Sequence, residues 1–219
     1  GCFNWQHPRF HGFFPANVTL VSLLADLLSG GLGQLGLSWQ SSPALTEVEE
    51  TMTDWLRQMV GLSPEWQGTI HDTASTASLV ALMCARERAS DQCALRGGLQ
   101  AAPQPLVVYH SAESNSSIEK AALLAGFGRD NLRPIATDAE HALRVDLLAD
   151  AMARDVSDGR RPCALVATTG STATTALDPV AAMAGLARKH GAWLHVDAAM
   201  AGSAMICPEL RWMWQGIES

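Results

Sequence analysis

The chain has 219 residues, a formal net charge of −7 and a hydrophobic content of 47%. This length predicts one large domain or two small ones, and the hydrophobic content suffices for a sizeable core. The negative charge argues against a nucleic-acid-binding protein and against one that adheres to anionic membranes, and no apolar stretch approaches the roughly 20 residues that span a bilayer.

The N-terminal part of the sequence predicts a loop followed by two helices. Residues 5–15 are rich in aromatic and turn-forming side chains, which is typical of a loop. Apolar spacing predicts a helix over residues 20–28 that ends at a glycine pair. A second helix is predicted over residues 43–60, because a serine precedes it as an N-cap and a proline fits its first position.

From residue 68 onwards, short apolar runs alternate with helical patterns. Strands are predicted over residues 68–70, 106–109, 132–136, 164–168 and 193–196. Helices are predicted over residues 74–90, 116–126, 141–156 and 179–190. Strands that are apolar on both faces and alternate with helices favour an α/β fold, with a mainly parallel sheet flanked by helices.

Ligands bind beyond the carboxyl ends of the strands in such sheets. Three segments should therefore meet on one edge of the sheet: the residues after Ile70, the loop over residues 168–175, and Asp197. We expect the functional site at this edge.

A glycine-rich segment, residues 31–36, matches the G-x-G-x-x-G pattern of dinucleotide-binding proteins. That function requires a strand before the pattern and a helix that begins inside it. Here a predicted helix precedes the segment and the next helix begins only near Pro43. We therefore interpret the segment as a turn in which two backbones approach closely.

The five cysteines lie far apart in the sequence, with no C-x-x-C pair and no metal-ligand spacing. They are Cys2, Cys84, Cys93, Cys163 and Cys207. We expect reduced thiols, no metal site and a cytoplasmic protein.

The segment HDTAST, residues 71–76, follows a predicted strand and opens a predicted helix. Free N–H groups and the positive end of the helix dipole bind anions such as phosphate at this kind of turn. A plain N-cap at Thr73 is the alternative interpretation. Asp72 counts against a phosphate site unless its carboxylate points away.

The segment WLHVDAAMAG ends a predicted buried strand in Asp197, which small residues follow at once. A buried carboxylate is costly without a cationic partner. A protonated pyridine nitrogen would be such a partner, because pyridoxal phosphate (PLP) enzymes place an Asp there to strengthen the ring as an electron sink. A structural role, as a cap or as the partner of an arginine, is the alternative.

Several motifs together resemble the group II PLP-dependent decarboxylases, and most closely the aromatic-L-amino-acid decarboxylases. They are WQHPRFHGFFP, SWQSSPALTEVE, DTAS, SSIEKAALLAG, ATTGSTATTALDP and WLHVDAAMAGSAMICPE, in this order. The resemblance implies the large domain of the type I PLP-dependent aminotransferase fold, incomplete here. It also implies PLP as the cofactor, a small amino-acid substrate, and a homodimer with sites at the subunit interface. Residues 1–60 would form an N-terminal active-site loop and helices, and residues 61–219 a PLP-binding large domain.

The resemblance also implies roles for individual residues around the cofactor. Asp197 would pair with the pyridine nitrogen, and His195 would support the site from behind. Ala74 and Ser75 would hold the phosphate. The other expected cofactor contacts are Thr172 and, on one face of the ring, Ala199.

Four residues of the N-terminal loop match positions that line the substrate's aromatic side chain in the family. They are Trp5, Phe13, Phe14 and Ala16. Aromatic walls suit an aromatic amino acid. Ordinary interface packing remains the alternative for these aromatic residues. Glutamate and cysteine-sulfinate decarboxylases are less favoured, because acidic substrates need a cationic pocket and this loop offers mostly aromatic residues. Arg9 is the one residue that argues for them.

Two features depart from the family pattern. Asn115 stands where the family usually has a histidine that stacks on the cofactor, and in some branches that form aldehydes an asparagine occupies this position. Asn115 is therefore a candidate catalytic and substrate-binding residue, and decarboxylation with oxidative deamination to an aromatic aldehyde is an alternative to amine formation.

The second departure is the lysine that binds the cofactor covalently in the family. It would follow Ser219, and neither Lys120 nor Lys189 matches it. We expect this chain to be a fragment of a longer enzyme that is inactive by itself. A non-catalytic protein with the same fold is the alternative.

Overall fold

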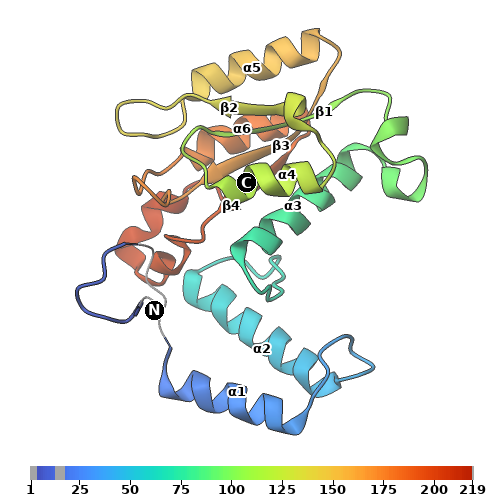
Figure 1. Ribbon diagram of the computed structural model, residues 1–219. Helices are drawn as coiled ribbons and strands as arrows, with labels where there is room; N and C mark the ends of the chain where they lie inside the picture. The colour runs from blue at the N-terminus through green and yellow to red at the C-terminus, as the bar shows by residue number, and fades with distance from the viewer. Residues whose placement is uncertain (1–3, 13–17, 219) are drawn as a thin grey trace. The chain divides into compact units, whose positions relative to one another are not determined.

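The computed structural model describes residues 4–12 and 18–218 and divides into two compact units (Figure 1). The first unit comprises residues 1–55 and 67–69, and the second comprises residues 56–66 and 70–219. Among the described residues, no helix combines the length and the apolar character that crossing a membrane requires.

The first unit contains helix α1 (Leu20–Leu32) and most of helix α2 (Pro43–Val60), whose last turn belongs to the second unit. The predicted end of α1 at the glycine pair is wrong. The helix continues to Leu32, and Gly33 ends it with a left-handed conformation (φ 60°), from which its N–H donates to the Gly30 carbonyl. Every residue of α1 is exposed, including seven large apolar side chains. They are Leu20, Val21, Leu23, Leu24, Leu27, Leu28 and Leu32.

The second unit is built on a four-stranded parallel sheet with the order β2-β1-β3-β4. The strands are β1 (Leu106–Ser111), β2 (Leu132–Ile135), β3 (Arg161–Thr168) and β4 (Trp193–Asp197). The helices are α3 (Ala74–Ala89), α4 (Ser116–Leu124), α5 (Val145–Ser157) and α6 (Val180–His190). Short 3-10 helices cover Cys93–Leu95, Gly98–Ala101, Arg129–Asn131, Gly202–Ile206 and Pro208–Trp214. This architecture confirms the predicted α/β class.

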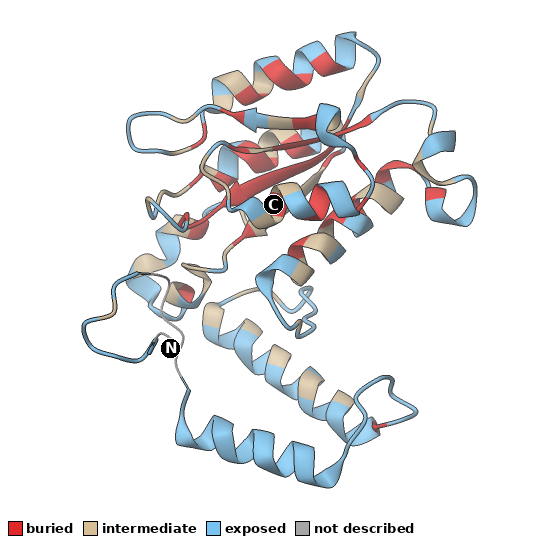
Figure 2. Cartoon of the chain, viewed as in Figure 1, coloured by how far each residue is buried: buried red, intermediate tan, exposed pale blue. Residues whose placement is uncertain are grey.

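Two hydrophobic clusters sandwich the sheet. One joins α3 and α4 to one face, and the other joins α5 and α6 to the opposite face. Figure 2 shows β1 and β3 as the most buried strands, because alternate side chains of each strand enter the two clusters. The apolar runs that predict these strands thus form the centre of the core.

A buried ionic network supports β1 and β2 from the side of α5. The Tyr109 hydroxyl donates to Asp155 Oδ2 at 2.9 Å, and Arg133 Nη2 donates to Oδ1 at 2.6 Å. Burial raises the pKa of Tyr109, and the Asp155 carboxylate adds to the rise. The phenol is therefore a permanent donor to Asp155 near neutral pH.

The predicted strand over residues 68–70 is wrong. These residues form no strand, and Ile70 is 60% exposed. A strand requires a neighbour for its backbone groups, and no described strand pairs with this short segment. The apolar pattern was too short to specify a partner.

Candidate cofactor and active site

The candidate site lies where β4 ends, at Asp197. This residue is 9% exposed and pairs in register with Thr168 of β3. Its carbonyl accepts the Thr169 N–H at 3.0 Å, and its carboxylate Oδ1 accepts the Ala199 N–H at 3.2 Å. The hydrogen bond to Ala199 shows that Asp197 also caps the turn that follows it.

A cationic partner for Asp197 is absent from the part of the chain that the structure describes, where no Lys or Arg lies within ion-pair distance of the carboxylate. An arginine partner, one of the structural alternatives, is therefore not found there. A buried carboxylate without a counter-charge is costly. The residue thus fits a group that brings its own positive charge, such as a protonated pyridine nitrogen.

His195 connects β4 to α3. It lies two residues before Asp197, so both side chains point to the same face of the sheet. Its Nε2 lies 3.1 Å from Ser78 Oγ in α3. Burial lowers the pKa of His195, and the nearby Asp197 carboxylate opposes part of the change. A neutral imidazole that anchors α3 beside Asp197 agrees with the expected supporting role.

The N-terminus of α3 begins one helical turn before Ser78. Thr73 is its N-cap, because Thr73 Oγ1 accepts the Thr76 N–H at 3.2 Å. The N–H groups of Ala74 and Ser75 have no acceptor among the described residues. The predicted N-cap is therefore present, and two donors remain for an anion.

Asp72 precedes this turn and is exposed. A hydrogen bond from the Thr76 side chain is the main cause that lowers the pKa of Asp72. The carboxylate is thus engaged with Thr76, although its negative charge remains close to the helix terminus.

The loops after β1 and β3 meet at the same edge of the sheet. Asn115 is the N-cap of α4, with its Oδ1 accepting the Ser117 N–H at 2.9 Å. Its Nδ2 donates to Thr172 Oγ1 at 3.2 Å. The structure therefore brings Asn115 and Thr172 together, and both remain exposed.

The residues present fit PLP. The buried Asp197 carboxylate, which has no ionic partner among the described residues, and two backbone N–H groups without a described acceptor belong to elements that His195 joins. Small or exposed side chains surround them, including Ala74, Ser75 and Ala199. Such a site can hold a planar ring with a cationic nitrogen at one end and a phosphate at the other.

Of the four N-terminal residues expected to line the substrate side chain, the structure describes Trp5. Trp5 belongs to the first unit, where it is 43% exposed and its ring centroid lies 5.4 Å from that of Phe10. Phe13, Phe14 and Ala16 lie outside the described residues. Their role in substrate binding stays a prediction.

Sequence reasoning missed Asp178, which is 5% exposed and follows the loop after β3. It accepts the backbone N–H groups of Leu143 and Thr168, each at 2.8 Å. Burial raises the pKa of its carboxyl group, and both hydrogen bonds oppose the rise. The only sequence signal is an acid between an apolar residue and Pro179, the N-cap of the next helix.

Gly170 is needed for the turn that follows β3. Its φ is +78°, and a Cβ atom there would lie 2.9 Å from the Ala201 Cβ. We expect Gly170→Ala to lower the free energy of unfolding by about 1–3 kcal/mol, because a strained backbone and a close contact coincide. Urea denaturation of the purified protein would measure this.

Gly185→Ala in α6 is the matched control. No neighbouring atom lies within 4 Å of a Cβ at this position. The same substitution should therefore stabilise the protein by about 0.5–1 kcal/mol through helix propensity. Equal effects of the two variants would contradict a special role for Gly170.

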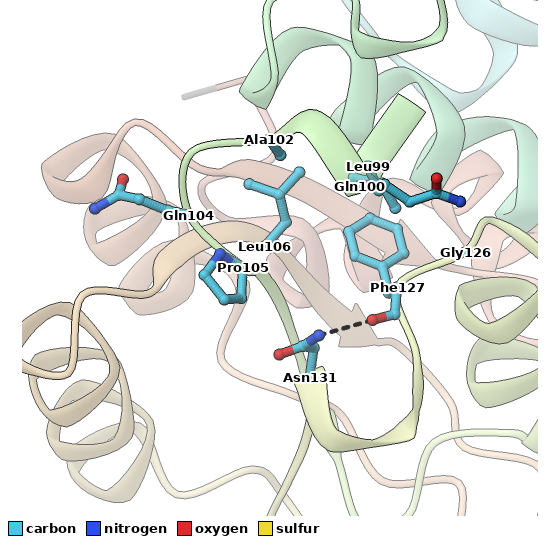
Figure 3. A pocket seen from close by; sticks show the side chains of 9 residues that line it. All are labelled: Leu99, Gln100, Ala102, Gln104, Pro105, Leu106, Gly126, Phe127 and Asn131. Carbon is cyan, nitrogen blue, oxygen red and sulfur yellow. Dashed lines mark hydrogen bonds between the residues drawn. The ribbon is translucent and has the colours of Figure 1, made fainter. Parts of the chain in front are cut away.

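A cavity of about 340 Å³ lies near Leu106, at the opposite, amino-terminal end of β1 (Figure 3). Its walls include Leu99, Pro105, Leu106 and Phe127. Asn131, which also lines it, donates to the Phe127 carbonyl at 2.8 Å. None of the predicted site residues line this cavity. Within residues 4–12 and 18–218, no three His, Cys, Asp or Glu side chains are placed to hold a metal ion.

Comparisons with known proteins show the family to which the chain belongs. The model of the pyridoxal-dependent decarboxylase conserved domain matches residues 1–219. Phenylacetaldehyde synthase of Arabidopsis thaliana and aromatic-L-amino-acid decarboxylase of Bos taurus are each 40% identical to the whole chain. The chain spans 45% and 46% of their lengths, respectively.

The structure of Oryza sativa TDC with PLP and tryptamine superposes with a TM-score of 0.93 at 38% identity. The match covers 100% of this chain and 46% of that one. Because the family model matches the entire sequence and the identities extend over all of it, the chain belongs to the pyridoxal-dependent decarboxylase family, whose cofactor is PLP.

Proposed function

We propose that this chain is part of an enzyme that decarboxylates an aromatic L-amino acid to the amine and carbon dioxide. The observation that supports this most strongly is the buried Asp197 carboxylate, which has no ionic partner in the described part of the chain. The relatives are named as aromatic amino acid decarboxylases and an aldehyde synthase.

The residues of the chain would act together as follows. Bound PLP supplies an electron sink for the electron pair of the breaking bond between Cα and the carboxylate. Asp197 would keep a proton on the pyridine nitrogen, and the N–H groups of Ala74 and Ser75 would bind phosphate oxygens. His195 fixes α3 against β4, which holds the phosphate donors at a constant distance from Asp197. Ala199 and Thr172 would contact the cofactor.

Aldehyde formation is the second candidate, and Asn115 is the observation that favours it. Its amide bonds to Ser117 and Thr172, and an amide has no aromatic face to stack on the cofactor. An open ring face would leave room for dioxygen. The balanced reaction consumes the amino acid, O2 and water, and it releases the aldehyde, carbon dioxide, ammonia and hydrogen peroxide.

A product assay on the enzyme that contains this chain tests both candidates. We expect carbon dioxide to be released from L-tryptophan, L-tyrosine or L-phenylalanine in the presence of PLP. Amine in a one-to-one ratio to carbon dioxide without hydrogen peroxide would remove the aldehyde hypothesis. Aldehyde and hydrogen peroxide in equal amounts would show that the enzyme forms the aldehyde, and the second candidate function would then take the place of the first. No carbon dioxide from any of the three would favour a non-catalytic protein.

We also infer that residues 1–219 by themselves turn over no substrate, because neither lysine is placed to bind the cofactor. Lys120 donates to Ser116 on the exposed side of α4, and Lys189 lies in the last turn of α6.

A homodimer is supported by the exposed apolar side chains of α1, which suit burial against a protein surface. A cytoplasmic location is supported by the free thiols of the described cysteines.

A further inference from the structure

Asp178 makes an unusual set of contacts for a residue outside the expected cofactor contacts. Its Oδ1 accepts the Leu143 N–H and its Oδ2 accepts the Thr168 N–H, both at 2.8 Å. Its own N–H donates to the Thr168 carbonyl at 2.9 Å. One buried carboxyl group thus joins the last residue of β3 to the segment before α5.

Thr168 in turn contacts both sides of the candidate site. It pairs in register with Asp197, and the next residue, Thr169, donates its N–H to the Asp197 carbonyl at 3.0 Å. On the other side, Thr168 Oγ1 lies 3.2 Å from Ser114 Oγ, next to Asn115. A shift at the end of β3 would therefore reach Asp197 and Asn115 together.

Asp178 also closes the loop that contains Thr172. The loop leaves β3 at Thr169 and returns through the bridge between Thr169 and Leu177. The two hydrogen bonds between Asp178 and Thr168 then fix its far end. Thr172 is held between this closed loop and the Asn115 amide.

The chemistry of Asp178 is demanding for a purely structural residue. The part of the chain that the structure describes supplies no ion pair to this carboxyl group. Only backbone N–H groups offset the cost of its burial. A carboxylate can accept an N–H group on each of two oxygens, whereas the amide of Asn offers only one acceptor oxygen.

We propose that Asp178 is a positioning residue of the cofactor site, which sets the end of β3 and thereby the placement of Asp197, Asn115 and Thr172. This role rests on the proposed function, because it assumes that these three residues surround PLP. Asp178 itself touches no reacting atom.

The test is Asp178→Asn in the enzyme that contains this chain. The amide group must turn an N–H toward one of the two backbone donors, so one hydrogen bond is lost and one repulsion appears. We expect the dissociation constant for PLP, measured by absorbance titration, to rise by about 10-fold to 100-fold, by analogy with the range seen for residues that orient the ligands of metal sites. We also expect faster hydrogen exchange at the amides of Thr169 and Ala199.

Asp155→Asn is the matched control. Asp155 is as buried as Asp178 and also accepts hydrogen bonds on both oxygens, but from Tyr109 and Arg133 on the α5 side of the sheet. This variant should lower the melting temperature and leave the PLP dissociation constant within about 2-fold of the original value, since it touches no residue of the site.

Each outcome separates the two proposals. A PLP dissociation constant unchanged by Asp178→Asn, or raised equally by Asp155→Asn, would overturn the positioning role while the proposed function stands. If the unsubstituted protein bound no PLP, the proposed function would fail. Hydrogen exchange would then decide, since unchanged protection at Thr169 and Ala199 in Asp178→Asn would reject the positioning role as well.

Discussion

Asp197→Ala, introduced into the enzyme that contains this chain, is expected to lower kcat for decarboxylation by about 10²–10³-fold or more. The carboxylate lies at the buried end of β4, and no described Lys or Arg forms an ion pair with it, so its charge is available to a ring nitrogen. Without a negative charge at this position, the nitrogen loses its proton near neutral pH and the ring withdraws electrons less strongly. Carbon dioxide release under saturating PLP measures the effect.

Asp197→Asn separates the charge from the shape of the side chain. Its amide oxygen can still accept the Ala199 N–H, so the turn after β4 should survive. Because the charge is gone, we expect nearly the same loss of turnover as for alanine. Asp146→Asn, at an exposed site in the first turn of α5, is the control and should leave kcat unchanged. Near-normal activity of Asp197→Asn would overturn the assigned role.

Asp155→Ala should cause the largest loss of stability among the substitutions considered. It removes the shared acceptor of Tyr109 and Arg133. Removing one partner of a buried ion pair costs about 3–5 kcal/mol, and since the Arg133 side chain is 26% exposed we expect about 3 kcal/mol. The free energy of unfolding from urea denaturation would show this.

Tyr109→Phe is the milder companion of that variant. It removes one hydroxyl and leaves the pair between Arg133 and Asp155 intact, so we expect a loss of about 1 kcal/mol. If both variants lost the same free energy, the ion pair would contribute nothing beyond the tyrosine hydrogen bond, and the network described for α5 would need revision.

The sheet, and the edge of it at which the candidate site lies, could be predicted from the sequence because they depend on local patterns. The apolar runs of β1 and β3 are long enough to identify buried strands, and parallel strands place their carboxyl ends on the same edge. The placement of Asp197 and of the loop that contains Thr172 follows from this rule, whereas Asn115 was identified only by the family resemblance. The structure shows Asn115 Nδ2 donating to Thr172 Oγ1.

What could not be predicted depends on partners far apart in the chain. Asp178 becomes notable only when Leu143, 35 positions away, donates to it. The strand expected over residues 68–70 is wrong for the related reason that a strand requires a neighbour. Three residues, of which only Ile70 has a large apolar side chain, are too few to specify that neighbour. The end of α1 was misplaced because Gly33, and not the glycine pair before it, adopts the left-handed conformation.

The placement of the thiols offers a way to observe the site directly. Cys84 on α3 and Cys207 after the first 3-10 helix beyond β4 are exposed, whereas Cys93 and Cys163 are buried. Burial raises the pKa of Cys163 to about 12, so maleimide reagents should leave it unmodified at neutral pH. After Cys2→Ser, a donor and an acceptor fluorophore on Cys84 and Cys207 would report by energy transfer whether α3 and the segment after β4 move when PLP is added.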